Sequence, residues 1–331
     1  MNCLRFLGVA ALGLMAGAGC CHLPASSRAA KALPLPASVS AQFDYVRSQE
    51  FLSQRKQSKV TPQFVVQSVQ WTNLAPVAGS NAVGRSITLD YFLPGRPGKH
   101  PVIMILPMLG GGYPLEKHFA VYFAKRGYAA LIVHRERPPK DLGWEAIDAI
   151  LKESVLDSRR AIDWIETRPE LDAERIGIFG ISMGGIKAAL LAPIEPRVRA
   201  AVMGLAGGDL AYVLSYTTEH GISKRREAIL REQSLTPIEL RKKLSHSIQC
   251  EPEALAPYLD SHKVLLILGA CDTVVPIKKG LELRRKMRKP ETILLPTGHY
   301  SAILLVPYIQ RQCFRFFERK MGPAAKEKDV H

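Results

Sequence analysis

From residue 101 onward, short apolar runs alternate with longer amphipathic segments, and this alternation limits the fold more than any other feature. The apolar runs cover residues 102–106, 129–133, 176–179, 200–205, 264–268 and 291–295. Continuous apolar runs are typical of strands buried on both faces, as in a parallel sheet. The longer segments between them, such as 115–126 and 144–167, have the spacing of crossover helices. The sequence therefore predicts an α/β fold with a mostly parallel central sheet and helices on both faces.

Two stretches depart from this alternation. Residues 41–57 place Phe43, Val46 and Phe51 on one side of a predicted amphipathic helix, ahead of predicted strands over 64–71 and 86–92. Residues 208–263 contain no clear strand but include a strong helix start at Thr236, and they predict a helical cap insertion. The predicted divisions are a signal peptide over 1–19, a tether and N-terminal helix over 20–62, the α/β domain over 63–321 with the cap at 208–263, and a charged tail over 322–331.

The N-terminus has the pattern of an export signal. Arg5 is the only charge in residues 1–19, and the apolar run that follows is too short for a comfortable membrane span. Small residues before Cys20 resemble the lipobox of bacterial lipoproteins, which predicts acylation of Cys20 and membrane anchoring through it. Cleavage after Ala18, giving a periplasmic or secreted protein, and an uncleaved anchor are the alternatives. Residues 20–40 are rich in Ala, Pro and Ser and predict a flexible tether.

Cysteine usage and charge exclude several other classes. Beyond the signal region only Cys250, Cys271 and Cys313 remain, without CxxC or His/Cys spacing, so neither a disulfide framework nor a structural zinc site is expected. No metal or cofactor motif is present. The net charge of +15 comes without a nucleic-acid recognition motif, so no nucleic-acid partner is expected, and solvated helix faces or an anionic surface account for the charge.

The strongest chemical signal is the segment IGIFGISMGG at residues 176–185. It combines an apolar strand, a G-x-S-x-G turn around Ser182 and the start of a helix. Such a turn holds the serine in a strained conformation with its hydroxyl exposed at the carboxyl edge of the sheet, and Gly180 and Gly184 avoid side-chain clashes there. Ser182 is therefore the predicted nucleophile.

The segment over residues 157–185 resembles the approach to the nucleophile in α/β-hydrolases of the dienelactone-hydrolase and prolyl-oligopeptidase-like groups. In element order the resemblance covers residues 101–321. It implies the α/β-hydrolase fold and a catalytic triad in the chain order serine, acid, histidine.

An aspartate and a histidine that follow Ser182 in the chain match the acid and the base of that order. Asp272 lies in GACDTVVP, directly after an apolar strand, and this is similar to the acid-bearing turn of the family. Asp209, in Gly-Gly-Asp after an earlier strand, is the alternative acid. His299 follows the last predicted strand in PTGHY and is the predicted base, whereas His134 precedes Ser182 and does not fit the order.

An oxyanion hole needs two N–H donors, and the resemblance places them on Met183 and on the loop after residues 102–106. That loop reads PMLGGG, and its position makes Leu109 the candidate for the second donor. Here the sequence departs from the family, because Pro107 and Met108 replace the usual His-Gly pair.

These features together predict a serine hydrolase acting on carboxylic esters through an acyl-enzyme, with a small-molecule ester or acyl substrate. A serine peptidase of the prolyl-oligopeptidase-like type and an acyltransferase are the enzymatic alternatives. A catalytically silent surface-binding lipoprotein is the alternative of another class.

Overall fold

The computed structural model describes residues 20–26, 32–47, 53–73, 85–109, 112–134 and 143–324. The predicted signal peptide at 1–19 and most of the predicted tail lie outside these residues. Within the described ranges, no helix combines the length and the apolar character that crossing a membrane requires.

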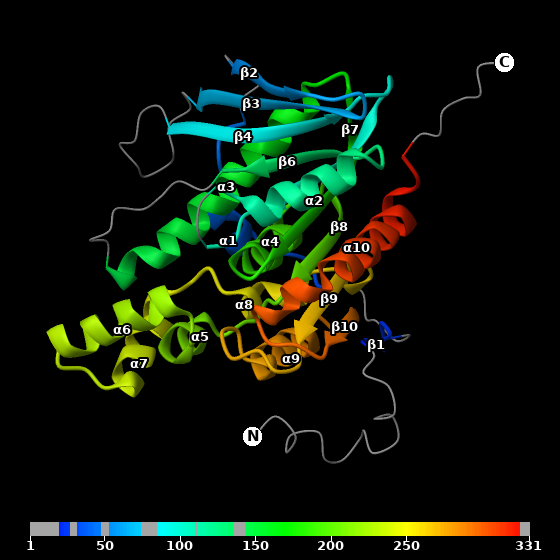
Figure 1. Cartoon of the computed structure of the whole chain (residues 1–331). Helices are drawn as coiled ribbons and strands as arrows, with labels where there is room; N and C mark the ends of the chain where they lie inside the picture. Colours follow the sequence, from blue (N-terminus) through cyan, green and yellow to red (C-terminus); the bar gives the residue numbers. More distant parts are fainter. Residues whose placement is uncertain are drawn as a thin grey trace.

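One ten-stranded sheet forms the centre of the molecule (Figure 1). Its strands, in spatial order, are β1 (Cys21–Leu23), β10 (Glu291–Leu295), β9 (Val264–Gly269), β8 (Val198–Gly204), β7 (Leu171–Ile181), β5 (His100–Leu106), β6 (Ala129–Val133), β4 (Arg85–Pro94), β3 (Phe64–Asn73) and β2 (Ser53–Val60). The six strands from β10 to β6 are parallel, and the outer strands pair antiparallel. The predicted, mostly parallel α/β sheet is confirmed.

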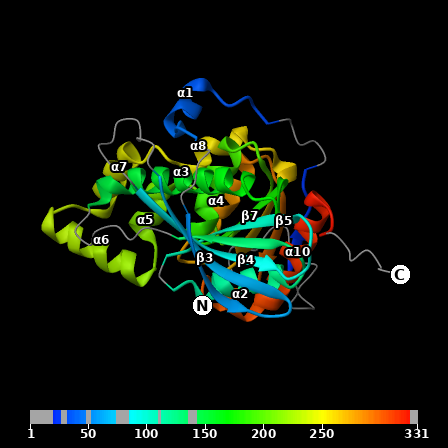
Figure 2. The same cartoon turned by 90° about the horizontal axis from the view of Figure 1, so that it is seen from above.

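Helices cover both faces of the sheet. On one face α2 (Pro114–Ala124) and α10 (Val306–Met321) bury aromatic side chains such as Phe123 and Phe317 against the strands. On the other face α3 (Ile147–Glu166), α4 (Met183–Ile194) and α9 (Ile277–Lys286) share a second core. Figure 2 shows α3 and α4 on the opposite side of the central strands from α2. This two-sided burial explains why the central strands are apolar over their buried stretches, such as residues 176–180 of β7 and residues 200–204 of β8.

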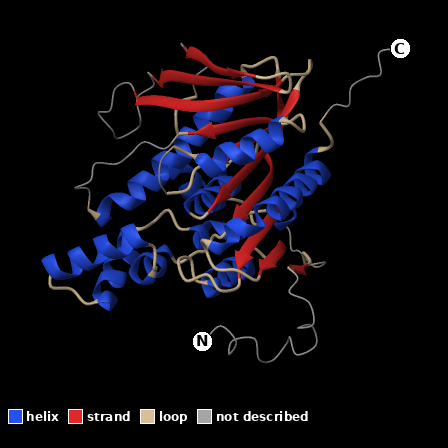
Figure 3. Cartoon of the chain, in the orientation of Figure 1, coloured by secondary structure: helices blue, strands red, loops and turns tan. Residues whose placement is uncertain are grey.

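Between β8 and β9 the chain forms helices that extend beyond the sheet (Figure 3). They are α5 (Leu210–Tyr216), α6 (His220–Glu232), α7 (Pro237–Ser247) and the short α8 (Pro252–Leu255). Helix α7 begins with a reciprocal capping box, in which Thr236 Oγ1 accepts from Glu239 N–H and the Glu239 carboxylate accepts from Thr236 N–H. The region is called the cap below.

The N-terminal segment differs from its prediction. The expected helix over 41–57 is wrong: a short α1 (Ala37–Ser40) and a 3-10 turn (Ala41–Phe43) end at Phe43, and β2 then pairs with β3. The expected free tether is wrong at Cys21–Leu23, which pairs antiparallel with β10. Edge strands are held by backbone hydrogen bonds to one neighbour and need no continuous apolar run, so apolar spacing could not find them.

Candidate active site

Ser182 lies in the sharp turn between β7 and α4. Its backbone has φ 56° and ψ −123°, a left-handed strained conformation for a residue with a side chain. A Cβ on Gly180 would lie 2.1 Å from the Gly184 oxygen, and one on Gly184 would lie 2.0 Å from the Leu106 oxygen. The two flanking positions therefore require glycine, and the turn holds the serine at the carboxyl edge of the sheet.

The structure brings Ser182, His299 and Asp272 together in one hydrogen-bonded series. His299 Nε2 lies 2.9 Å from Ser182 Oγ, and His299 Nδ1 lies 2.7 Å from Asp272 Oδ2. The other carboxylate oxygen, Oδ1, accepts from the N–H groups of Val274 and Val275 at 2.9 Å each. Asp272 is 5% exposed, so backbone donors and the imidazole compensate its burial.

Neighbouring parallel strands explain why an acid and a histidine so far apart in sequence meet. The loops after β9 and β10 emerge at the same sheet edge, where Ala270 N–H donates to Leu295 O at 2.9 Å and Cys271 N–H donates to Thr297 O at 3.0 Å. These bonds hold the two loops side by side and so fix the spacing between Asp272 and His299.

The alternative acid, Asp209, is engaged elsewhere. Its Oδ2 pairs with Lys279 Nζ at 2.8 Å and with Arg241 Nη2 at 3.1 Å, and its Oδ1 accepts from Tyr212 N–H at the start of α5. Burial raises the pKa of Asp209, but the bonds from Lys279 and Tyr212 outweigh it and hold the pKa below its usual range. Asp209 thus anchors the cap, and Asp272 is the carboxylate that contacts the histidine.

The two oxyanion-hole candidates, Met183 and Leu109, both line the cavity at Ser182. The preceding N–H, that of Met108, is already used: it donates to Glu116 Oε1 at 3.0 Å. Glu116 lies in the first turn of α2 and is 5% exposed. Sequence reasoning missed this carboxylate, because an acidic residue in a first helical turn is common and carries no motif.

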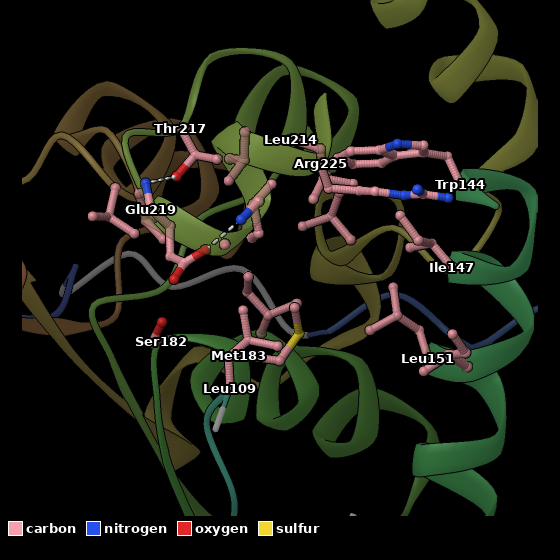
Figure 4. Close-up of a pocket in the computed structure, with 18 of the residues that line it drawn as sticks. Leu109, Trp144, Ile147, Leu151, Ser182, Met183, Leu214, Thr217, Glu219 and Arg225 are labelled. Carbon is pink, nitrogen blue, oxygen red and sulfur yellow. Dashed lines mark hydrogen bonds between the residues drawn. The ribbon is translucent and has the colours of Figure 1, made fainter. Parts of the chain in front are cut away.

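Two pockets open on either side of Ser182. The first has a volume of about 450 Å³ and lies between α3, α4 and the cap; the second has a volume of about 330 Å³ and lies against the His299 loop. Figure 4 shows the first pocket, with Ser182 at one end and Trp144, Ile147 and Leu151 at the other. Glu219 lines both pockets and accepts from Ile222 N–H at 2.6 Å, which caps α6.

The pocket walls were not predicted individually. Trp144, Arg225 and Glu219 come from segments that carry no local motif, and only the assembled fold brings the cap residues Arg225 and Glu219 and the start of α3 around one cavity. In the described part of the chain, no three His, Cys, Asp or Glu side chains gather as a metal-ligand set.

Part of the chain, including the turn that holds Ser182, is similar in sequence to known proteins. A model of the dienelactone hydrolase family matches residues 90–205, which include β5, the serine turn and β8. An uncharacterized protein of Mycobacterium tuberculosis is 28% identical over 150 residues, 44% of this chain and 33% of that protein. A probable 2-oxo-3-(5-oxofuran-2-ylidene)propanoate lactonase of Bradyrhizobium sp is 28% identical over 113 residues, 32% of this chain and 45% of the lactonase. The chain thus spans less than half the length of the curated relatives it matches.

Solved structures resemble the chain over most of its length. An acetyl xylan esterase from Paenibacillus sp. R4 superposes with a TM-score of 0.62 at 20% identity, covering 86% of this chain and 100% of the esterase. Acetyl xylan esterase 1 from Thermoanaerobacterium sp. superposes with a TM-score of 0.57 at 17% identity, covering 84% of this chain and 99% of the esterase. At such identities the likeness establishes a shared fold.

Proposed function

We propose that this chain, an α/β-hydrolase whose residues 90–205 match the dienelactone hydrolase family, is a serine hydrolase that cleaves carboxylic esters. The observation that carries the proposal is the bonding of His299 to Ser182 at 2.9 Å and to Asp272 at 2.7 Å. A base beside a hydroxyl and an orienting carboxylate behind the base form the arrangement that activates a serine nucleophile.

The first half of the reaction forms an acyl-enzyme. Ser182 Oγ attacks the ester carbonyl carbon as its proton passes to His299 Nε2, and the carbonyl electron pair moves onto oxygen. The N–H groups of Met183 and Leu109 are the proposed donors to that oxyanion. His299 then gives the proton to the leaving oxygen, the carbon–oxygen bond breaks, and the alcohol departs.

The second half releases the acid. A water molecule attacks the acyl carbon while His299 Nε2 takes its proton, and the returning proton restores Ser182 Oγ–H. Throughout, Asp272 accepts from His299 Nδ1–H, which keeps Nε2 directed at the serine and stabilises the imidazolium.

Replacing the nucleophile tests the proposal. Ser182→Ala is expected to lower turnover of p-nitrophenyl esters by at least about a thousandfold, because no covalent intermediate can form. It is also expected to abolish labelling by a fluorophosphonate probe. A panel of peptide amides, and of acceptor alcohols in place of water, separates the esterase from a peptidase and an acyltransferase.

A surface serine provides the matched control. Ser245 lies in α7, and its hydroxyl donates to Lys242 O at 2.8 Å, outside both pockets. Ser245→Ala should retain labelling and turnover. Wild-type labelling in folded Ser182→Ala would refute the nucleophile, and a wild-type protein that neither labels nor hydrolyses any ester would favour a silent binding protein.

A further inference from the structure

The two pockets beside Ser182 differ in which reacting groups they contain. Ser182, Leu109 and Glu219 line both. Met183 lines the first pocket only, and His299 lines the second pocket only. The scissile bond of an ester at Ser182 therefore has separate spaces for its two halves.

The direction of proton transfer decides which half goes where. His299 Nε2 must reach the leaving oxygen as the carbon–oxygen bond breaks, so the alcohol has to lie on the histidine side. That side is the second pocket, whose other walls include Leu115, Val306 and Ile309. The acyl chain is left to the first pocket.

The first pocket is long and mainly apolar. Leu151 and Leu214 line it and are themselves 3% and 8% exposed, and Figure 4 shows Trp144, Ile147 and Leu151 across the cavity from Ser182. A volume of about 450 Å³ is within the range of sites that take ligands much larger than acetate. The methyl of an acetyl group would contact only the end nearest the nucleophile.

We propose that the preferred substrate is an ester of an extended aliphatic acid with an apolar alcohol, the acyl chain in the first pocket and the alcohol in the second. This rests on the proposed ester hydrolysis. Each methylene that becomes buried in the first pocket should raise kcat/KM by about fourfold, until the chain reaches Trp144. Small acetyl esters should be poor substrates, although the acetyl xylan esterases share the fold.

An acyl series with a constant leaving group provides the first test. With p-nitrophenyl acetate, butyrate, hexanoate and octanoate, kcat/KM of the wild-type protein should rise by about sixteenfold from acetate to butyrate and should continue to rise with each longer chain that still fits the first pocket. Equal or better use of acetate would overturn the inference and leave ester hydrolysis standing. The absence of all ester turnover together with the absence of fluorophosphonate labelling would instead refute the proposed function itself.

The charged residues of the first pocket require a second substrate comparison. Lys187 and Arg225 also line it, and Arg225 lies beside Trp144 at the end away from Ser182 (Figure 4), where it would attract a carboxylate on the acyl chain. The carboxylate of Glu219 lines the same pocket and most of the other walls are apolar, so burying a second carboxylate there is costly. We therefore expect the octanoyl ester to be hydrolysed faster than the matching monoester of octanedioic acid. The reverse order would overturn the aliphatic assignment in favour of an anionic acyl group.

Pocket-filling variants test the placement of the two halves. Ile147→Trp fills the far end of the first pocket and should lower the octanoate-to-acetate ratio of kcat/KM by tenfold or more. Ile309 is 5% exposed and lines the second pocket, so Ile309→Trp should narrow that pocket and lower kcat/KM for octanoate esters of longer alcohols instead. An exchange of these two effects would overturn the assignment of the pockets.

The control for these variants is Ile238→Trp. Ile238 is 74% exposed on α7 and lies outside both pocket linings, so this variant should keep the wild-type acyl ratio. Fluorophosphonate labelling and thermal melting of each variant distinguish a filled pocket from a misfolded chain. A labelled, folded Ile147→Trp protein with the wild-type ratio would overturn the proposal.

Discussion

At the scale of single residues, hydrogen bonds fix the orientation of the Asp272 carboxylate in the active site. Asp272 receives two backbone N–H bonds on one oxygen and the imidazole on the other. The first oxygen holds the carboxylate in place and the second orients His299. A neutral replacement of similar shape can keep the first function while losing the second.

Asp272→Asn is therefore expected to fold normally and to lower kcat by about a thousandfold to ten-thousandfold, since an amide neither fixes the histidine tautomer nor stabilises its charged form. Steady-state kinetics and thermal melting measure the two effects separately. Asp209→Asn is the comparison: it should lower the melting temperature through the loss of the Lys279 and Arg241 pairs, with a much smaller change in kcat. The opposite pattern would make Asp209 the catalytic acid.

The sequence predicted these residues because each follows a strand within a short motif. Ser182 was expected from its strand–turn–helix pattern, and Asp272 and His299 from their positions after strands together with the chain order that the family resemblance implies. The structure places the three within hydrogen-bond reach. The sequence favoured Asp272 and kept Asp209 as the alternative acid. The contact that occupies Asp209 comes from Lys279, a residue on another helix, and could not be predicted from the local pattern. Glu116 was missed for the same reason, because its importance comes from the loop it contacts.

At the scale of secondary-structure elements, the start of α2 supports the loop that carries Leu109. The Glu116 carboxylate accepts from Met108 N–H at 3.0 Å, one residue before the proposed oxyanion donor. This bond ties the glycine-rich loop to a helix packed on the sheet. Glu116 lines neither pocket at Ser182, so we expect it to position the loop rather than to contact the substrate.

Removing that bond should loosen the oxyanion donor. Glu116→Ala is expected to reduce kcat by about tenfold to a hundredfold with little change in KM, because small displacements of a reacting group are costly. Glu116→Gln retains an acceptor oxygen and should restore most of the rate. Equal losses in the two variants, or a loss confined to KM, would contradict the positioning role.

A second element-scale feature is a hydrogen-bonded contact inside the cap, between the residue before α8 and the start of α5. Glu251 precedes α8, and its two oxygens accept from the N–H groups of Asp209 and Leu210 at 2.9 and 2.8 Å, where α5 begins. Burial raises the pKa of Glu251 to about 7, although the hydrogen bonds from backbone N–H groups act to lower this pKa. The carboxyl therefore stays protonated in the folded protein at pH values where an unfolded chain has lost that proton.

This difference predicts how stability changes with pH. The contribution is fully present below about pH 4.5, the ordinary pKa of a glutamate, and is lost as the pH rises to about 7. The loss is on the order of 3 kcal/mol of unfolding free energy. Urea denaturation at pH 5 and pH 8 should show a larger decrease for the wild-type protein than for Glu251→Gln, which does not titrate. Equal decreases would show that Glu251 does not titrate in this interval.

The cap also shows what sequence patterns leave undetermined at this scale. The capping box at Thr236 correctly predicted the start of α7, because its hydrogen bonds are local. The position of the cap relative to Ser182 depends on contacts across the whole chain, so the first pocket could not be outlined beforehand. The strands β1 and β2 escaped prediction because one neighbour's backbone is enough to hold an edge strand.

At the scale of the whole molecule, an ion-pair cluster joins the N-terminal segment to the body. Arg197 Nη1 lies 2.6 Å from Asp163, its Nη2 lies 2.7 Å from Glu195, and Tyr45 donates to Asp163 at 2.9 Å. Arg159 also donates to Phe43 O at 2.8 Å. Phe43 and Tyr45 are therefore bound to the folded body.

We propose export of the protein and acylation of Cys20, on the sequence pattern of its N-terminus. When the full chain is expressed in bacteria, radiolabelled palmitate should be incorporated into the wild-type protein and into Cys21→Ser, and should be absent from Cys20→Ser. The adjacent cysteine is a close control, since the two variants differ only in position. Equal labelling of both variants, or no labelling of the wild type, would exclude the lipoprotein.

The pairing of β1 with β10 then determines how such a protein would sit in its surroundings. Cys20 immediately precedes β1 and is partly buried against the core. Within β1, His22 Nε2 lies 2.6 Å from the hydroxyl of Tyr308 on α10. A lipid on Cys20 would hold the edge of the sheet against the bilayer, with no free linker between them. The height of the catalytic serine above the lipid, and the side from which an ester arrives, would then be set by the dimensions of the folded body.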